Sequence, residues 1–207
     1  MLPAAISTYA PRVIIPSFFI GQASLRISDR TVLFQNAAFS FLFVSTVIVL
    51  FQNENPWLAA IPGIAATSYF MMLRDRDNIE KYRYIDWALT TPLMLFAILR
   101  AIKADTLTIV TLILSDLVMI ATGYKGVKEK DERYFWIGIL AFVPIVATLL
   151  TAKSNKPAIY LTLALWTVYP ILYYLNEKNV LSEDKTNQAY SVMDVLAKVG
   201  LVNLLKF

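Results

Sequence analysis

The chain has 207 residues, of which 57% are hydrophobic and only 16% are charged, and its mean hydropathy is +0.57. This composition is too apolar for an ordinary soluble domain of this size and indicates a protein whose solvent is the lipid bilayer. The sequence contains no cysteine and no histidine, which excludes a disulfide framework, a thiol nucleophile and the commonest metal ligands, so no metal site is predicted. The net charge of +4 comes from short basic clusters between apolar runs, which are typical of the flanks of membrane spans rather than of a nucleic-acid surface.

Residues 1–30 precede the first long apolar run and are predicted to form a separate N-terminal extension. Its apolar stretch, residues 14–21, is too short to span a bilayer and is interrupted by Pro16. We expect a short interfacial or capping helix here, and a signal-peptide remnant is the alternative.

Seven apolar runs follow, each about as long as the roughly 20 helical residues that cross a hydrocarbon core of ~30 Å. The predicted spans are 31–51, 57–73, 82–101, 106–124, 134–152, 158–176 and 188–206. The polar connectors between them are too short to fold alone. Residues 31–207 are therefore predicted to form one all-α domain, an integral membrane bundle of seven helices.

Five ionisable residues are the informative ones within the predicted spans, because a charge near the bilayer centre costs about 2.5–3.5 kcal/mol and therefore usually faces the bundle interior. They are Arg83, Asp86, Asp116, Asp194 and Lys198. Asp194 and Lys198 are four residues apart, so they share one helix face, and Arg83, Asp86 and Thr90 share a face of the third span. One interpretation is a structural salt-bridge cluster. The other is a reactive lysine, because an amine in an apolar pocket is a competent nucleophile toward an aldehyde.

Three motifs in the later spans resemble those of one known family. The third span reads RYIDWALTTPL from Arg83 to Leu93, the sixth contains W-x-x-Y-P from Trp166 to Pro170, and the seventh contains D-x-x-x-K-x-G beginning at Asp194. In this order they are similar to the signature motifs of the microbial rhodopsins. The likeness covers the third to seventh spans.

The resemblance implies a light-activated membrane protein rather than an enzyme, with all-trans retinal in the centre of the bundle, bound through a Schiff base on Lys198. It implies that Asp86 is the primary counterion and proton acceptor and that Asp194 is the second counterion. It also implies that Arg83 gates proton release beyond Asp86 and that Thr90 hydrogen-bonds to Asp86. The residues that it places against the retinal are Trp87, Thr91, Met94, Met119, Trp166, Tyr169, Pro170 and Tyr173.

The resemblance leaves the transport function open. Ala97 lies where efficient outward proton pumps of the family carry an acidic proton donor, so we expect reprotonation from cytoplasmic water to be slow. The favoured function is an outward proton pump, and the alternative is a light-gated ion channel or a sensory photoreceptor. A sodium or chloride pump is disfavoured because Asp86 and Thr90 are retained.

Several polar residues have less specific predicted roles. Thr186 replaces a carboxylate that is frequent on the release side, which leaves Glu177, Glu183 and Asp184 as candidates there, each more simply explained as a solvated charge. Asp116 is expected to hydrogen-bond to Thr91 across a helix interface rather than to transfer protons. The side chains expected to make interhelical hydrogen bonds, with a water path as the alternative, are Gln35, Asn36, Ser40 and Asn203.

The predicted orientation depends on which rule is followed. Leaving out Lys198, 13 Lys and Arg residues lie on the side of the N-terminus and 5 on the other side, so the positive-inside rule predicts a cytoplasmic N-terminus. The resemblance implies an extracellular N-terminus, which is the orientation we expect.

The compact chain also resembles the viral and proteorhodopsin-like branches, many of which form pentamers. The expected partners are therefore membrane lipid, protons or other small cations, and further copies of the chain.

Overall fold

The computed structural model describes residues 28–52, 55–152 and 157–205, and every regular element in them is a helix. The elements are α1 (Asp29–Gln52), η2 (Pro56–Ala59), α2 (Ala60–Arg74), η3 (Arg76–Asn78), α3 (Ile79–Ala101), α4 (Thr106–Glu129), α5 (Glu132–Thr151), α6 (Pro157–Glu177) and α7 (Glu183–Leu204). The predicted seven-helix bundle is confirmed, with ends within a few residues of those expected except that α4 and α7 extend further. The helix predicted within residues 1–27 lies outside the described residues.

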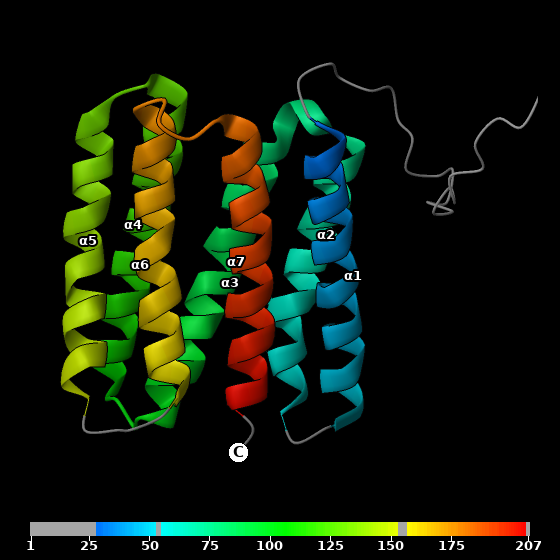
Figure 1. Cartoon of the computed structure of the whole chain (residues 1–207). Coiled ribbons are helices and arrows are strands. Elements are labelled where there is room, and N and C mark those ends of the chain that lie inside the picture. The colour runs from blue at the N-terminus through cyan, green and yellow to red at the C-terminus, as the bar shows by residue number, and fades with distance from the viewer. Residues whose placement is uncertain (1–27, 53–54, 153–156, 206–207) are drawn as a thin grey trace, which may run out of the picture.

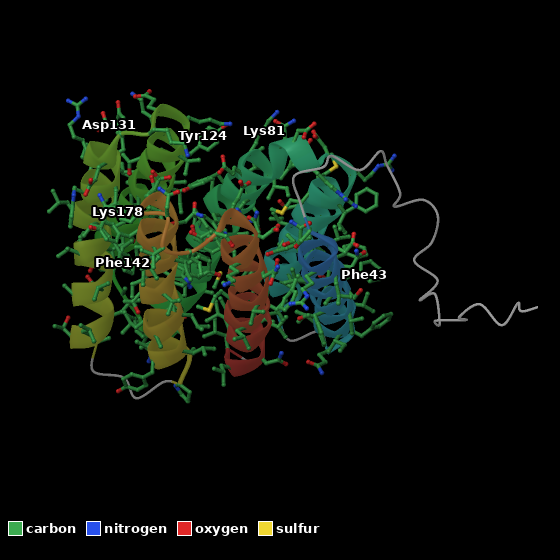
Figure 2. All side chains as sticks on the ribbon, turned by 45° about the horizontal axis from the view of Figure 1, so that its top comes forward. Phe43, Lys81, Tyr124, Asp131, Phe142 and Lys178 are labelled. Atoms are coloured by element: carbon green, nitrogen blue, oxygen red, sulfur yellow. The ribbon has the colours of Figure 1, made fainter. Side chains whose placement is uncertain are left out.

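The seven helices run up and down beside one another, with α3 and α7 in the middle (Figure 1). Helices α1 and α2 lie on one side of this pair, and α4, α5 and α6 lie on the other. We call the end that holds the start of α1 and the α2–α3, α4–α5 and α6–α7 connections the upper end. Figure 2 shows Lys81 and Asp131 at this end, whereas Phe43 projects from the outer side of α1.

The hydropathy of the helices follows their place in the bundle. By length and composition, α1, α2 together with η2, α4, α5 and α6 are long and apolar enough to cross a membrane. The central helices α3 and α7 fall below that standard and carry four of the five buried charged side chains of the described residues. These four charged side chains are at most 3% exposed, so they face the protein interior rather than lipid. The chain is a multi-pass integral membrane protein.

The lower half of the bundle is a continuous apolar core. Side chains from all seven helices pack there around Met94, Ile98 and Leu201, each at most 1% exposed. Ala97 lies within this cluster and is buried. Apolar side chains therefore surround Ala97, the position at which efficient outward pumps carry a proton donor.

The prediction of interhelical hydrogen bonds on α1 and α7 is wrong for three residues. The amides of Asn36 and Asn203 and the hydroxyl of Ser40 each donate to the carbonyl four residues earlier in their own helix. The backbone carbonyl one turn earlier in the same helix is the nearest acceptor for a short polar side chain. The fourth residue, Gln35, is fully buried, and neither of its amide atoms has a partner within the described chain.

Candidate functional site

Lys198, Asp86 and Asp194 form a buried ionic cluster at the centre of the bundle. The Nζ atom of Lys198 lies 2.9 Å from Asp86 Oδ2 and 2.8 Å from Asp194 Oδ1. None of the three side chains is more than 2% exposed. The cluster unites α3 and α7, as the helical spacing predicts. One amine therefore sits between two carboxylates, where a cation on its nitrogen is balanced without water.

The two carboxylates differ in their other hydrogen bonds. Asp194 accepts hydrogen bonds from Tyr69 Oη at 2.8 Å, Tyr169 Oη at 2.9 Å and Trp87 Nε1 at 3.1 Å. Asp86 has one side-chain partner besides the lysine, Thr90 Oγ1 at 3.1 Å from Oδ1, and this hydroxyl shares its single proton with the Asp86 backbone oxygen at 2.8 Å. Each donor stabilises a buried anion. Asp194 is therefore the better stabilised anion, and Asp86 is the more available proton acceptor.

A largely apolar cavity of about 110 Å³ adjoins the lysine. All nine residues predicted to hold the retinal line it: Trp87, Thr91, Met94, Met119, Trp166, Tyr169, Pro170, Tyr173 and Lys198. Lys198 and Asp194 are the only charged side chains among the described lining residues. An amine at one point of a cavity walled by rigid aromatic and apolar groups suits a long apolar aldehyde, so the residues present fit retinal.

The wall that α5 contributes was missed in the sequence. Its lining residues are Tyr134, Phe135, Gly138, Ile139 and Phe142. Their spacing of one, four, five and eight residues from the first marks a single helix face, so the signal was available. The ring of Phe135 stacks on that of Tyr173 with centroids 5.4 Å apart and 6° between the planes. A Cβ atom added at Gly138 would lie 3.1 Å from Thr122 Oγ1, which indicates that this glycine lets α5 approach α4 closely.

Arg83 lies nearer the upper end than the carboxylates, and none of its described ion pairs or hydrogen bonds is to Asp86 or Asp194. Its Nη2 atom donates to Asn187 Oδ1 at 2.6 Å, and its guanidinium carbon lies 4.8 Å from the centre of the Tyr190 ring. It borders a second cavity of about 30 Å³, which we call the outer cavity. The outer cavity is lined by Glu80, Arg83, Tyr84, Trp87, Val127, Tyr173, Asn176, Glu177, Glu183, Thr186, Asn187 and Tyr190.

The three candidate release-side acids fall into two groups. Glu177 and Glu183 line the outer cavity, together with Glu80, which the sequence interpretation missed although it is three residues from Arg83. Asp184 lies elsewhere, because it accepts hydrogen bonds from the Ser28 backbone at 3.2 Å and from Thr31 Oγ1 at 3.0 Å. The expectation that Asp184 is a free solvated acid is wrong, since it joins the start of α7 to the start of α1.

Asp116 forms the hydrogen bond expected from the sequence. Thr91 Oγ1 lies 2.7 Å from Asp116 Oδ2, which joins α3 to α4. The same hydroxyl lies 2.7 Å from the Trp87 carbonyl oxygen. The other carboxyl oxygen of Asp116, Oδ1, is buried without a partner in the described chain. Asp116 therefore holds two helices together beside the cavity and makes no contact with Lys198.

The comparisons with known proteins agree with this geometry. A family model of bacteriorhodopsin-like proteins matches residues 30–206. Archaerhodopsin-2 from Halobacterium sp. (strain aus-2) is 33% identical over 171 residues, which cover 68% of this chain and 66% of that protein. Bacteriorhodopsin from Halobacterium salinarum is 29% identical over 170 residues, with 68% and 65% covered. The chain thus spans slightly less than two thirds of the length of these relatives.

Solved structures show the same fold. Cyanorhodopsin from Calothrix sp. NIES-2098 superposes with a TM-score of 0.77 at 24% identity, covering 86% of this chain and 94% of that one. A light-driven proton pump from Leptosphaeria maculans gives 0.77 at 23% identity, covering 86% and 95%. Because the family model matches residues 30–206, the chain belongs to the bacteriorhodopsin-like family, the microbial rhodopsins, whose members bind retinal through a Schiff base on a lysine.

Proposed function

We propose that the protein is a light-driven proton pump that holds retinal on Lys198 and moves protons toward the upper end of the bundle. The observation that carries this proposal is the Lys198 nitrogen between two carboxylates of unequal hydrogen bonding. Bound there, retinal supplies the absorption of visible light and the change of shape that follows it. The remaining parts of the machinery are side chains of this chain.

The first step is a proton transfer between two atoms 2.9 Å apart. The N–H bond at Lys198 breaks, and an O–H bond forms at Asp86 Oδ2. Asp194 stays ionised, because its three additional hydrogen bonds would be weakened by protonation. Thr90 positions Asp86 through its bond to Asp86 Oδ1. The direction of transfer therefore follows from the difference between the two carboxylates.

Release would take place through the outer cavity. Arg83 lies on α3 one turn above Asp86 and borders this cavity, where Glu177 and Glu183 provide carboxylates near the upper surface. A proton that leaves Asp86 in this direction meets these polar groups. The opposite direction offers only the apolar lower half of the bundle.

Uptake is the slow part of the proposed cycle. Ala97 provides no proton donor, and the surrounding lower core is hydrocarbon. Water must enter this core from the lower end before the Lys198 nitrogen regains its proton. The same feature favours the second candidate, a light-gated channel or a photoreceptor, in which a long-lived state rather than fast turnover is used.

The similar proteins support transport. Bacteriorhodopsin and the archaerhodopsins are among the relatives, and the solved structure from Leptosphaeria maculans is that of a light-driven proton pump. We propose in addition that the upper end is extracellular, that residues 31–207 are the retinal-binding domain, that residues 1–30 are an extension to it, and that the chain forms homo-oligomers in the lipid bilayer.

The test is the light-induced pH change of unbuffered cells or vesicles that contain the retinal-loaded protein. Pumping is expected to change the external pH, and both a protonophore and the substitution Asp86→Asn are expected to abolish the change. A complete photocycle without net pH change would refute the pump. Photocurrents recorded over a range of voltages would then identify a channel, and their absence would favour a photoreceptor.

A further inference from the structure

Arg83 is a buried cation that no described carboxylate pairs with. Arg83 is 3% exposed, and its Nε atom has no hydrogen-bond partner within the described residues. Its described polar contacts are the amide oxygen of Asn187 at 2.6 Å and the ring of Tyr190 at 4.8 Å. A buried charge takes its position from the few groups that stabilise it. These two neutral groups therefore determine where the guanidinium lies.

The ring of Tyr190 is itself held by the site. It stacks nearly parallel to the Tyr169 ring, with centroids 5.7 Å apart and 14° between the planes, and meets the Trp87 ring edge-on at 5.3 Å. Tyr169 and Trp87 both donate hydrogen bonds to Asp194. Packed aromatic rings have little freedom to move. Tyr190 thus links the position of Arg83 to the carboxylate that remains charged.

Four aromatic side chains separate the two cavities. Tyr84, Trp87, Tyr173 and Tyr190 line both the retinal cavity and the outer cavity, and we call them the aromatic wall. Arg83 lines only the outer cavity, and Lys198 lines only the retinal cavity. The positive charge of Arg83 is therefore on the release side of the wall.

Helix α7 carries on one face both the residues that contact Arg83 and two residues of the ionic cluster. Asn187 and Tyr190 precede Asp194 by seven and four residues, and Lys198 follows it by four. At 3.6 residues per turn these spacings align the side chains along one stripe. The helix that bears the retinal lysine thus also bears both contacts that position the arginine.

We propose that Asn187 and Tyr190 are positioning residues that hold Arg83 on the outer-cavity side of the aromatic wall, away from the pair Asp86 and Asp194. Lys198 is then the sole described cation in contact with this pair, and Arg83 is available to the acids of the outer cavity. The inference rests on the proposed function, since it assigns roles around the same lysine.

The first experiment compares the visible absorption band of the retinal-loaded protein with that of Asn187→Leu and Tyr190→Leu. Either substitution is expected to free Arg83 to approach the two carboxylates, which weakens their negative field at the Lys198 nitrogen and moves the band to longer wavelength. Tyr190→Phe is the matched control, because it retains the ring that contacts Arg83, and its band is expected to shift less than that of Tyr190→Leu. Light-triggered proton release is expected to slow about tenfold in the two leucine variants, as the loss of a contact to a buried charge implies.

A double-mutant cycle separates action through Arg83 from a direct effect. In the Arg83→Gln background, Asn187→Leu and Tyr190→Leu are expected to shift the band no further. Equal shifts in both backgrounds would overturn the proposal. Nitrogen NMR of the arginine side chains in retinal-free protein gives an independent readout, in which the Arg83 resonance is expected to move in the leucine variants and to move less in Tyr190→Phe.

The outcomes distinguish this inference from the proposed function. If the wild-type protein forms no visible band with all-trans retinal, the retinal function fails, and the NMR comparison still decides whether Asn187 and Tyr190 hold Arg83. If the visible band stays at the same wavelength in both leucine variants, the positioning role is refuted and the proposed retinal function is not affected. If Tyr190→Leu does not fold, the cycle with Asn187→Leu decides by itself.

Discussion

Asp86 and Asp194 share one lysine, yet their remaining contacts give them different chemistry. Asp194 is surrounded by three donors from three different helices, whereas Asp86 has a single threonine from its own helix. In the proposed cycle, the carboxylate on the helix that carries the lysine is therefore the one that stays ionised. The D-x-x-x-K spacing alone does not contain this distinction, because the donors come from α2, α3 and α6.

Tyr69→Phe tests the strength of this support. The substitution removes the 2.8 Å hydrogen bond to Asp194 Oδ2 and leaves a buried charged oxygen with one donor fewer. We expect the free energy of unfolding to fall by about 1.5–3 kcal/mol, the usual range for a hydrogen bond to a charged group. Thermal unfolding in detergent measures it. Tyr174→Phe, at a partly exposed position on α6, is the control and should change little, and equal effects of both changes would contradict the prediction.

Asp116 offers a prediction about its protonation. Thr91 Oγ1 lies 2.7 Å from two acceptors, Trp87 O and Asp116 Oδ2, and a hydroxyl has a single proton. Both bonds can form together only if Asp116 carries a proton of its own. We therefore expect the neutral isostere Asp116→Asn to retain the stability and the visible band of the wild type.

Asp116→Ala removes the same group without replacing it. It is expected to lower the free energy of unfolding by about 1–3 kcal/mol, because Thr91 loses a buried partner and a space is left between α3 and α4. Calorimetry or thermal unfolding of both variants checks the pair. A large loss in Asp116→Asn would show that the carboxyl is ionised.

At the scale of elements, the sequence predicts well which helices exist and in what order. It predicts less well which face each helix turns to the site. The seven apolar runs give all seven helices, because about 20 apolar residues in succession have few other stable forms in a bilayer. The helix ends come from local capping instead. Asp105, Asp131 and Ser182 accept hydrogen bonds from backbone N–H groups at the starts of α4, α5 and α7.

The faces that α5 and α7 turn to the site depend on packing between helices. Tyr134 and Phe142 on α5, and Asn187 and Tyr190 on α7, each show helical spacing, but the spacing does not say which neighbouring helix the face contacts. The motifs select Asp86, Asp194 and Lys198 because charges are rare in a membrane. Aromatic and amide side chains are not rare enough to be selected in this way.

The cap of α4 gives a pH-dependent prediction. Asp105 accepts hydrogen bonds from Thr108 Oγ1 at 2.6 Å and from the Thr108 N–H at 2.9 Å, and these bonds lower the pKa of Asp105 below its ordinary value of 3.8. A carboxylate whose pKa is lowered on folding stabilises the protein above the unfolded pKa. That contribution is lost as the pH falls through the folded pKa.

Asp105→Asn retains an acceptor at the cap but has no charge to lose. We expect its melting temperature in detergent to lie below that of the wild type at neutral pH, and the difference to shrink as the pH falls below about 4. Asp77→Asn, in the exposed η3 turn, is the matched control. A difference between wild type and Asp105→Asn that is independent of pH would contradict the prediction.

For the whole molecule, the arrangement of charge follows the arrangement of helices. The two helices that hydropathy alone would not select, α3 and α7, are central and bear the ionic cluster, whose three side chains are at most 2% exposed. The basic residues of the connections concentrate at the upper end. There they pair in part with acids, as in Lys178 with Glu132 at 2.9 Å and Arg133 with Asp131 at 2.7 Å. These ion pairs reduce the net charge of the upper end, but the positive-inside rule counts lysine and arginine alone and still favours a cytoplasmic upper end.

The absence of cysteine from the sequence allows a direct test of orientation. Lys128→Cys and Lys103→Cys each introduce one exposed thiol, at the upper and the lower end respectively, and each removes one positive charge. If the upper end is extracellular, a membrane-impermeant maleimide should label Lys128→Cys in intact cells and Lys103→Cys only after lysis. The wild-type chain is the unlabelled control. The reverse pattern would place the outer cavity on the cytoplasmic side and would turn the proposed proton movement inward, in agreement with the positive-inside count.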